Sequence, residues 1–550
     1  MHYTLFLTSL LACATAVSVK TKGGALNAKG RIDHLPLPVQ IHNAHQAPKR
    51  QVVERAVKVP RFLNAKTKPF AVNGTGIPEV TFDVGESYSG QLPISSDPKE
   101  ESKFFWWFFP STNPAAEKEI LIWLNGGPGC SSLEGFMQEN GPFSWQYGTF
   151  RPVANPWSWH TLTNVVYVEQ PVGTGFSTGK VTATSEEDVA KQFMGFWKNF
   201  IELFSMQGYK VYITGESYAG LYCPYIASAF LDAKDTKYYN VKGMMLYDAA
   251  LAPFTLTQHA PTVSFVDHWG PLFPLNDTFR AQIHARADKC GYTKFMKDYL
   301  VYPPKGPMTD PLPGIGDDGE YKDGCGMIYY DIRSAMALIN PCFNVYHVTT
   351  TCPLLWDVLG FPGSNDYVPD GANIYFDRAD VKAAIHAPAN VKWTTCAPGD
   401  VFVDGYDNSD YPSQNGILGG VIERTNNVVI GHGALDMILQ ANGTLLSIQN
   451  TTWGGKLGFQ SRPKDVFFVP YHDEVSLGTM AGAGNMGVVH TERGLTYVSV
   501  DLAGHMVPQY APAAAYRQLE FLLGRVDCMN CTKPFTTTTE QRSILVPKKA

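Results

Sequence analysis

The sequence predicts an α/β fold with a mostly parallel central sheet. Five short apolar runs are bounded by turn residues, as expected of strands buried on both faces: 120–124, 165–168, 211–214, 428–431 and 497–500. Between two of them, at 186–204, apolar residues recur at three- and four-residue intervals, which indicates an amphipathic helix. A helix between two such strands is typical of a βαβ unit and hence of parallel strands.

The other elements are predicted from changes in local composition and apolar pattern along the chain. Residues 82–92, around two glycines, predict hairpin strands, and 103–109 predicts an aromatic strand. From 252 to 368 Pro and Gly are frequent and no strong buried-strand run occurs, which indicates an insertion built on the core. We therefore expect these segments: a core in two parts, 53–251 and 369–531, the insertion at 252–368, and a disordered tail at 532–550.

Composition and charge exclude several classes of protein. Of the 550 residues, 44% are apolar, 13% aromatic and 17% charged, whereas disordered chains have fewer aromatic and more charged residues. The 44 basic and 50 acidic residues give a net charge of 44 − 50 = −6, so the basic surface that nucleic-acid binding requires is missing. Beyond the N-terminus no run of about 18 apolar residues predicts a membrane span.

The N-terminal 16 residues have the features of a secretory signal peptide rather than of a short buried helix. Residues 3–12 are mostly apolar, and Ala14-Thr-Ala16 has the small-x-small form of a cleavage site. Residues 17–52 contain the dibasic pair Lys49-Arg50 and indicate a pro-segment; the alternative is an N-terminal arm that stays attached. We expect a secreted protein, with a vacuole-like or lysosome-like compartment as the alternative.

Sequons and cysteines agree with export. Five asparagines lie in N-x-S/T sequons: Asn73, Asn276, Asn442, Asn450 and Asn530. Removal of the signal leaves nine cysteines, so at least one thiol is unpaired. Cys528-Met-Asn-Cys531 has no second cysteine pair at zinc spacing and is interpreted as a local disulfide.

The strongest local motif is Gly215-Glu-Ser-Tyr-Ala-Gly220, between the predicted strand at 211–214 and a helical segment at 221–231. A serine on a sharp turn between a buried strand and a helix projects its Oγ above the sheet, and the helix N-terminus offers amides to a developing oxyanion. Ser217 is therefore the candidate nucleophile. Ala219 departs from the usual G-x-S-x-G pattern, so the motif alone leaves open a serine that merely caps the turn.

A nucleophilic serine needs a base and an orienting carboxylate, and in α/β-hydrolases these follow in the order Ser, Asp, His. Asp436 comes just after the predicted strand at 428–431, and His505 follows the strand at 497–500. Both positions lie where the carboxyl edge of a parallel sheet meets its loops, which is the expected place for a site. A lone His after a strand is more often structural, but three roles in the expected order favour catalysis.

Other sites are weaker. His432 and Asp436 form an i, i+4 pair, but no third ligand cluster and no H-E-x-x-H motif is visible. The segment 173–175, Gly-Thr-Gly, lacks the spacing of a dinucleotide fingerprint, and no G-x-x-x-x-G-K-[ST] loop occurs. We therefore expect neither a metal nor a cofactor.

Three motifs in order resemble the serine carboxypeptidase family, most of all its secreted fungal members: Trp123-Leu-Asn-Gly-Gly-Pro-Gly-Cys-Ser-Ser132, Gly215-Glu-Ser-Tyr-Ala-Gly220 and Ala503-Gly-His-Met-Val-Pro508. The likeness runs from roughly residue 80 to 523. It implies an α/β-hydrolase fold with a mostly parallel sheet and a helical, disulfide-bearing insertion, or cap. It also implies a triad of Ser217, Asp436 and His505.

The resemblance further implies which residues bind the free α-carboxylate of a substrate: Asn125, Gly126, Glu139 and Glu216. Glutamates can face a carboxylate if they are protonated, and both burial and crowding raise a Glu pKa. Reaction with peptides should then favour acidic conditions, and above roughly pH 6 to 7 ionised glutamates should repel the substrate. The implied oxyanion hole consists of the backbone amides of Gly127 and Tyr218.

The resemblance also implies disulfides. The pairs are Cys130–Cys396, which would tie the Asn-Gly-Gly loop to the later half of the chain, Cys290–Cys325 and Cys342–Cys352. Together with the local Cys528–Cys531 bond they leave Cys223 unpaired, on the apolar helix after Ser217, as an inert core thiol.

These observations predict a secreted serine carboxypeptidase that removes residues from peptide or protein C-termini through an acyl-enzyme, favoured at acidic pH. The alternative is an acyltransferase that uses the same triad; Glu139 and Glu216 favour a substrate with a free carboxylate and hence the peptidase. A binding or scaffold protein without activity is a third possibility, which the intact triad disfavours. The sequence does not distinguish a monomer from a homodimer.

Overall fold

A computed structural model describes residues 60–360, 369–472 and 482–537. The predicted signal peptide (1–16) and pro-segment (17–52) lie outside the described residues. None of the helices in the described part of the chain combines the length and the apolar character needed to span a bilayer.

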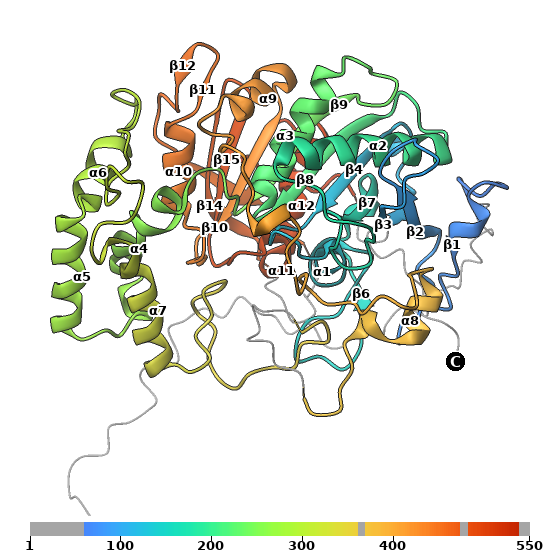
Figure 1. Ribbon diagram of the computed structural model, residues 1–550, viewed down its shortest axis with the longest axis horizontal. Coiled ribbons are helices and arrows are strands. Elements are labelled where there is room, and N and C mark those ends of the chain that lie inside the picture. Colours follow the sequence, from blue (N-terminus) through green and yellow to red (C-terminus); the bar gives the residue numbers. More distant parts are fainter. Residues whose placement is uncertain (1–59, 361–368, 473–481, 538–550) are drawn as a thin grey trace, which may run out of the picture. The chain divides into compact units, whose positions relative to one another are not determined.

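The core is an 11-stranded sheet whose six central strands run parallel (Figure 1). In spatial order the strands are β1 (Ala71–Val72), β2 (Ser87–Pro93), β3 (Lys103–Phe109), β7 (Asn164–Glu169), β4 (Glu119–Leu124), β8 (Lys210–Glu216), β9 (Val241–Tyr247), β10 (Val428–Gly433), β15 (Leu495–Val500), β14 (Gly484–Glu492) and β13 (Asp465–Val469). The strands outside the parallel block, at both edges, pair antiparallel. Two short hairpins, β5–β6 (Phe143–Ser144, Val153–Ala154) and β11–β12 (Thr452–Trp453, Lys456–Leu457), lie apart from the sheet.

Both faces of the parallel strands are buried, as their sequences predict. In β4 the side chains of Leu121 and Trp123 enter one hydrophobic core, while Ile120, Ile122 and Leu124 enter the other. Side chains alternate between the faces of a strand, so a continuous apolar run fills both layers. All five predicted apolar strands, and the aromatic strand β3, are confirmed.

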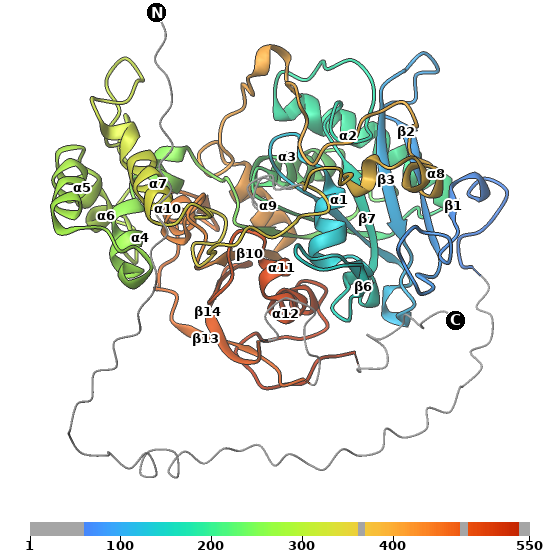
Figure 2. The same cartoon turned by 90° about the horizontal axis from the view of Figure 1, so that it is seen from below.

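Helices cover the two faces in separate layers (Figures 1 and 2). One core joins the sheet to α2 (Glu186–Phe204), α3 (Ala219–Asp232) and α9 (Ile417–Thr425), and the other joins it to α1 (Ser132–Gly135), α11 (Val507–Tyr510) and α12 (Pro512–Leu522). Two more helices lie at α8 (Ala379–Ala384) and α10 (Ala441–Gln449). Helix α2 has the bounds that its apolar spacing predicts, and its aromatic stripe, including Phe193, Trp197 and Phe200, is buried.

The predicted insertion contains four helices between β9 and β10: α4 (Thr262–His268), α5 (Asp277–Lys289), α6 (Tyr292–Tyr299) and α7 (Ile328–Ile339). Figures 1 and 2 show them gathered beside the β10–β14 side of the sheet. They have a hydrophobic core of their own, which also takes in Leu435 and Met437. Because these two residues flank Asp436, the insertion packs directly on the loop that carries the candidate acid.

Some predicted elements differ from the structure. Residues 82–92 do not form a hairpin: β2 begins only at Ser87 and pairs with β1 and β3. Strand β9 was not predicted, because its sequence, VKGMMLY, has a glycine and two methionines in place of a β-branched run. Strands β13 and β14 were also missed, since β14 is only partly buried and lacks a continuous apolar run.

Residues 532–537, which we expected to begin a disordered tail, lie against α12. The backbone carbonyl of Lys533 accepts a hydrogen bond from Arg517 (2.7 Å), and the backbone N–H and hydroxyl of Thr536 both donate to Glu520 (2.6 Å). The ring of Phe535 packs on those of Trp157 and Tyr516. These contacts correct the prediction for this segment, and residues 538–550 lie outside the described residues.

Candidate active site

Ser217 occupies a strained turn between β8 and α3. Its φ of 60° is in the left-handed region, which non-glycine residues adopt only where the surrounding structure fixes them. The N–H of Ser217 donates to the carbonyl of Tyr247 (3.0 Å), and its carbonyl accepts from Ala250 (2.9 Å) and Gly220 (2.9 Å). The turn is thus held by the segment that follows β9, and Ser217 remains partly exposed, as a nucleophile must.

Asp436 and His505 meet at the same edge of the sheet. His505 Nδ1 lies 2.7 Å from Asp436 Oδ2, and Asp436 Oδ1 accepts hydrogen bonds from the amides of Ile438 (2.8 Å) and Leu439 (3.3 Å). Asp436 is completely buried and His505 is 2% exposed. Because the carboxylate accepts a hydrogen bond from Nδ1–H, Nε2 is left as the basic nitrogen, and Nε2 has no hydrogen-bond partner among the described residues.

The insertion contributes to the placement of His505. The backbone N–H of His505 donates to the carbonyl of Tyr346 (2.7 Å), and the Tyr346 ring packs edge-on against the imidazole at 5.1 Å between centroids. Gly504 permits this approach, because a Cβ there would lie 2.2 Å from the same carbonyl. His505, the candidate base, is therefore held by contacts from both the core and the insertion.

The Asn-Gly-Gly loop lies directly against the turn at Ser217. A Cβ at Gly126 would lie 2.4 Å from the amide nitrogen of Tyr218 and 2.7 Å from Ser217 Cβ, so only glycine fits. Gly127 has a φ of 111°, which is accessible to glycine alone, and is exposed at the surface of the loop. The two residues implied for an oxyanion hole, Gly127 and Tyr218, thus belong to adjoining backbone segments.

Asn125 is the centre of a cluster of buried carboxyl groups. Its Oδ1 accepts from Trp123 Nε1 (2.7 Å) and the Gly135 amide (3.2 Å), which turns Nδ2 toward the acids. Nδ2 lies 2.6 Å from Glu134, 3.0 Å from Glu216 and 3.5 Å from Glu139. The structure brings together the three predicted polar side chains and adds Glu134, which the sequence analysis missed.

Ionisation of the three glutamates is unfavourable in this environment. Burial raises the pKa of Glu134, Glu139 and Glu216 well above the usual value, and charge on a neighbouring glutamate raises it further. One oxygen atom from each of the three carboxyl groups lies within 4.8 Å of the other two, and Glu134 Oε1, Glu139 Oε2 and Glu216 Oε2 accept no hydrogen bond from an N–H or hydroxyl of the described residues. Carboxyl groups this close avoid adjacent buried charges when they hold protons. Neutral carboxylic acids are therefore the natural state of this cluster at acidic pH.

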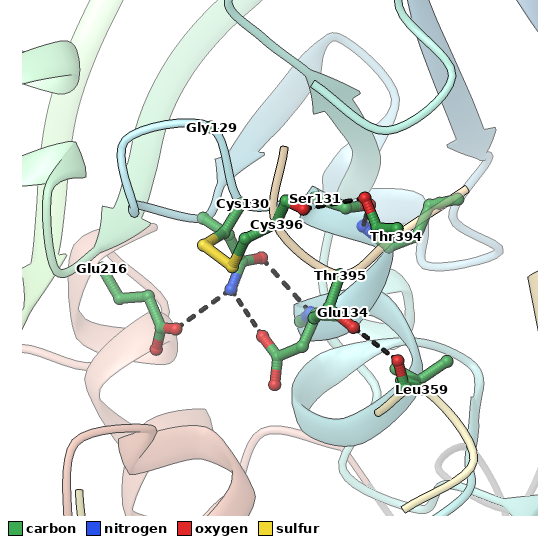
Figure 3. The surroundings of a disulfide bond; sticks show 12 residues. Gly129, Cys130, Ser131, Glu134, Glu216, Leu359, Thr394, Thr395 and Cys396 are labelled. Carbon is green, nitrogen blue, oxygen red and sulfur yellow. Dashed lines mark hydrogen bonds between the residues drawn. A yellow bond between two sulfur atoms is a disulfide. The ribbon is translucent and has the colours of Figure 1, made fainter. Parts of the chain in front are cut away.

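A disulfide secures the loop beside this cluster. Cys130 and Cys396 are bonded, and backbone hydrogen bonds run from Ser131 to Thr395 (2.7 Å) and from Ala397 to Gly129 (2.8 Å). Figure 3 shows the bond next to Glu216 and Glu134. The other bonds are Cys290–Cys325, Cys342–Cys352 and Cys528–Cys531, so the structure contains all four predicted pairs. Cys223 is free and buried, as expected.

His432, the other candidate partner of Asp436, is a neutral structural residue. Its Nε2 lies 2.8 Å from the carbonyl of Leu439 and 3.2 Å from Asp248 Oδ1, and its Nδ1 lies 2.9 Å from the Thr444 hydroxyl. Burial lowers the pKa of His432 to about 4. Asp248 also escaped the sequence analysis, although it follows a buried strand, the signal that identified Asp436.

The five sequon asparagines all reach the surface to some extent. Asn73, Asn276 and Asn530 are exposed, whereas Asn442 and Asn450 are partly exposed. Asn276 also caps α5, because its side chain accepts from the Phe279 amide (2.9 Å).

Comparisons with known proteins agree with this geometry. Residues 78–524 match the family described as serine carboxypeptidase. A "Probable serine carboxypeptidase" of Arthroderma benhamiae is 55% identical over 489 residues, covering 87% of this chain and 89% of that protein. Serine-type carboxypeptidase F of Aspergillus niger is 44% identical over 546 residues, covering 96% of this chain and all of that protein.

A solved structure supports the fold independently. Kex1(delta)p, a prohormone-processing carboxypeptidase from Saccharomyces cerevisiae, superposes with a TM-score of 0.66 at 22% identity, covering 84% of this chain and 98% of its own. At this identity the likeness concerns the α/β-hydrolase fold alone. The match over residues 78–524 and the two fungal relatives show that this chain belongs to the serine carboxypeptidase family.

Proposed function

We propose that this serine carboxypeptidase removes single residues from free peptide C-termini through an acyl-enzyme on Ser217, and that it does so best at acidic pH. The observation that carries the proposal is that the acid cluster and the candidate nucleophile are joined by neighbouring residues of the chain. Glu216, whose carboxyl group belongs to the acid cluster, immediately precedes Ser217 in the chain. A substrate carboxylate at the cluster therefore brings the last peptide bond close to the nucleophile.

Each step of the reaction has a residue to perform it. Ser217 Oγ attacks the scissile carbonyl while His505 Nε2 removes the hydroxyl proton, and Asp436 stabilises the imidazolium that forms. The amides of Gly127 and Tyr218 bind the oxyanion. His505 then protonates the leaving amine, the acyl-enzyme forms, and water activated by the same histidine releases the shortened peptide.

The acid cluster supplies selectivity for a free C-terminus. Protonated Glu139 or Glu216 donates a hydrogen bond to the substrate carboxylate, and Asn125 Nδ2 offers a second donor once it turns from a glutamate to the substrate. A blocked C-terminus, such as an amide, has no negative charge for these donors. We expect it to bind poorly.

The same cluster explains the preference for acid. Because the pKa values of the glutamates are raised, the neutral donors persist above the usual range for Glu and are lost as the pH rises through those values. Ionised glutamates then repel the substrate carboxylate, which is itself ionised above about pH 3.5. Peptidase activity should fall toward neutral pH even where His505 is a competent base.

Secretion, N-glycosylation and removal of residues 17–52 complete the proposal. They are supported by the small-x-small site at Ala14-Thr-Ala16, the pair Lys49-Arg50 and five asparagines with surface exposure. A vacuole-like destination would use the same signal. The exported protein is expected to be shorter at the N-terminus and heavier by its glycans.

The proposal is tested by incubating the purified enzyme with an N-blocked peptide and with its C-terminal amide at about pH 4.5 and pH 7. We expect stepwise loss of C-terminal residues by mass spectrometry, faster at the acid pH and poor on the amide. Labelling of Ser217 by a fluorophosphonate without any peptide cleavage would contradict the peptidase and favour transfer of another acyl group. Absence of labelling in the folded protein would contradict the triad itself.

A further inference from the structure

Asp248 lies at the carboxyl end of β9, between the strands that carry the proposed triad. In the sheet, β9 separates β8, which leads into Ser217, from β10, which leads to Asp436; β15, beside β10, leads to His505 (Figure 1). Four neighbouring parallel strands therefore each end near a residue with acid, base or nucleophile chemistry. Only the one at the end of β9 has no part in the mechanism above.

Tyr247 and Asp248 together link the turn at Ser217 to the loop that carries Asp436. The Asp248 side chain is completely buried, and Oδ1 accepts from the Gly433 amide (2.9 Å). An oxygen atom of Asp248, an oxygen atom of Asp436 and a ring nitrogen of His505 all lie within 4.8 Å of one another. The backbone carbonyl of Tyr247, the preceding residue, accepts a hydrogen bond from the N–H of Ser217.

Within the described residues no lysine or arginine forms an ion pair with Asp248, which lies 3.2 Å from His432 Nε2. The titratable groups around it are Glu216 from the end of β8, Tyr247 from its own strand, His432 and Asp436 from β10 and its loop, and Tyr497 and His505 from β15 and its loop. His432 is neutral because burial lowers its pKa to about 4. Burial and the charge of Asp436 raise the pKa of Asp248 well above its usual value.

The hydrogen bonds decide which of the two acids is charged. Asp436 lies 2.7 Å from His505 Nδ1 and accepts hydrogen bonds from the backbone amides of Ile438 and Leu439. All three contacts favour the ionised form of Asp436. Asp248 Oδ2, in contrast, is buried without a hydrogen bond from any N–H or hydroxyl in the described part of the chain. Two adjacent buried carboxyl groups cannot both ionise cheaply, so the charge belongs on Asp436 and the proton on Asp248.

We propose that Asp248 is a positioning residue of the reaction: it remains a neutral carboxylic acid and donates a hydrogen bond to the carboxylate of Asp436, which orients His505. This inference rests on the proposed triad. The bond fixes the rotamer of Asp436 and spreads its negative charge, which limits how tightly it holds a proton on His505. Asp248 would thereby set the acid limb of the pH profile without touching the substrate.

The test compares wild type, Asp248→Asn and Asp248→Ala as full-length enzymes, with Asp298→Asn on the surface of α6 as the matched control. An N-blocked amino-acid ester serves as substrate, because it has no free carboxylate and its pH profile reports the triad rather than the glutamate cluster. Folding is verified by circular dichroism, and labelling by a fluorophosphonate verifies Ser217.

The neutral asparagine can donate to Asp436 as the acid does. We expect Asp248→Asn to retain kcat/KM within about threefold and to leave the acid limb in place. Asp248→Ala should lower kcat about 10-fold to 100-fold with little change in KM, because a hydrogen bond to a charged group is lost. Its acid limb should move to higher pH, since a less stabilised Asp436 holds the proton on His505 more tightly.

Three results would overturn the proposal. If Asp248→Asn moves the acid limb to lower pH, Asp248 is ionised in the wild type. If Asp248→Ala loses thermal stability but keeps kcat and the pH profile, the residue is structural only. A folded wild type that is not labelled at Ser217 would remove the proposed triad and this inference together. Should the asparagine variant not fold, Asp248→Ser keeps a neutral donor and must leave the acid limb unmoved.

Discussion

Two groups of buried acids adjoin Ser217, and they differ in what faces them. Glu134, Glu139 and Glu216 surround the side-chain amide of Asn125, whereas Asp248 and Asp436 lie beside the imidazole of His505. An amide donates hydrogen bonds but takes up no proton between about pH 4 and pH 7, so the protons stay on the glutamates. In the proposed mechanism the imidazole becomes cationic, so one aspartate must stay ionised to stabilise the positive charge.

The comparison shows that burial alone does not assign a protonation state. Asn125, Glu139 and Asp436 are all nearly or completely inaccessible to water, yet the acids have opposite roles. In the proposed function the glutamates are neutral, and the only negative charge at their cluster is that of the bound substrate carboxylate. In the aspartate pair the charge is present throughout, and its counterpart appears on His505 as the proton moves.

The largest effect should come from removing the one ionised acid. Asp436→Asn leaves the shape of the site intact but presents the wrong partner to His505 Nδ1, so we expect kcat to fall about 10⁴-fold. The measurement is steady-state hydrolysis of both a peptide and an N-blocked ester, with the folded fraction checked by circular dichroism. A loss of less than about tenfold on both substrates would contradict the assignment of charge to Asp436.

A smaller effect is expected from the acid cluster, and on peptides only. Glu216→Gln keeps a neutral donor and cannot ionise, so activity at acid pH should be largely retained and the decline toward neutral pH should be weaker. We expect the ratio of activity at pH 7 to activity at pH 4.5 to be about tenfold higher in the variant than in wild type. Peptide hydrolysis as a function of pH measures this, and an unchanged profile would rule out the protonated-glutamate account.

The smallest effect concerns stability. A glutamate whose folded pKa is raised stabilises the protein fully below its unfolded pKa, near 4.3, and this contribution is lost as the pH rises through the folded pKa. Glu134→Gln removes one such group, so the decline in the free energy of unfolding above about pH 4.3 should lessen by up to ~1.4 kcal/mol per pH unit.

Thermal unfolding of this variant and of wild type between pH 4 and 7 provides the measurement. The exposed pair Asp298 and Lys294 supplies the control, because Asp298→Asn should not alter the slope. Parallel curves for Glu134→Gln and wild type would show that Glu134 is already ionised in the native protein.

The sequence predicts the three residues of the proposed triad but not Asp248 beside them. Ser217, Asp436 and His505 each follow a buried strand, so strand prediction and chain order suffice to place them at one edge of the sheet. Asp248 was missed because β9 lacks β-branched residues and was not recognised as a strand.

Glu134 was missed for a different reason. It lies on α1, five residues before Glu139, and nothing in the local pattern distinguishes it from an exposed helical glutamate. Its burial depends on contacts of Asn125 and Glu139, which only the tertiary structure reveals. The ordered position of Phe535 was missed for the same reason, because it depends on packing against Trp157, which is far away in the chain.

The central claim is that the glutamate cluster binds a substrate carboxylate as a neutral acid. It is tested most directly by calorimetric titration of Ser217→Ala with an intact N-blocked dipeptide, in pairs of buffers that differ in ionisation enthalpy, at about pH 4.5 and pH 7. The account predicts weaker binding at pH 7, accompanied by uptake of about one proton per peptide, and little uptake at pH 4.5. Equal affinity at both pH values without proton uptake would contradict it.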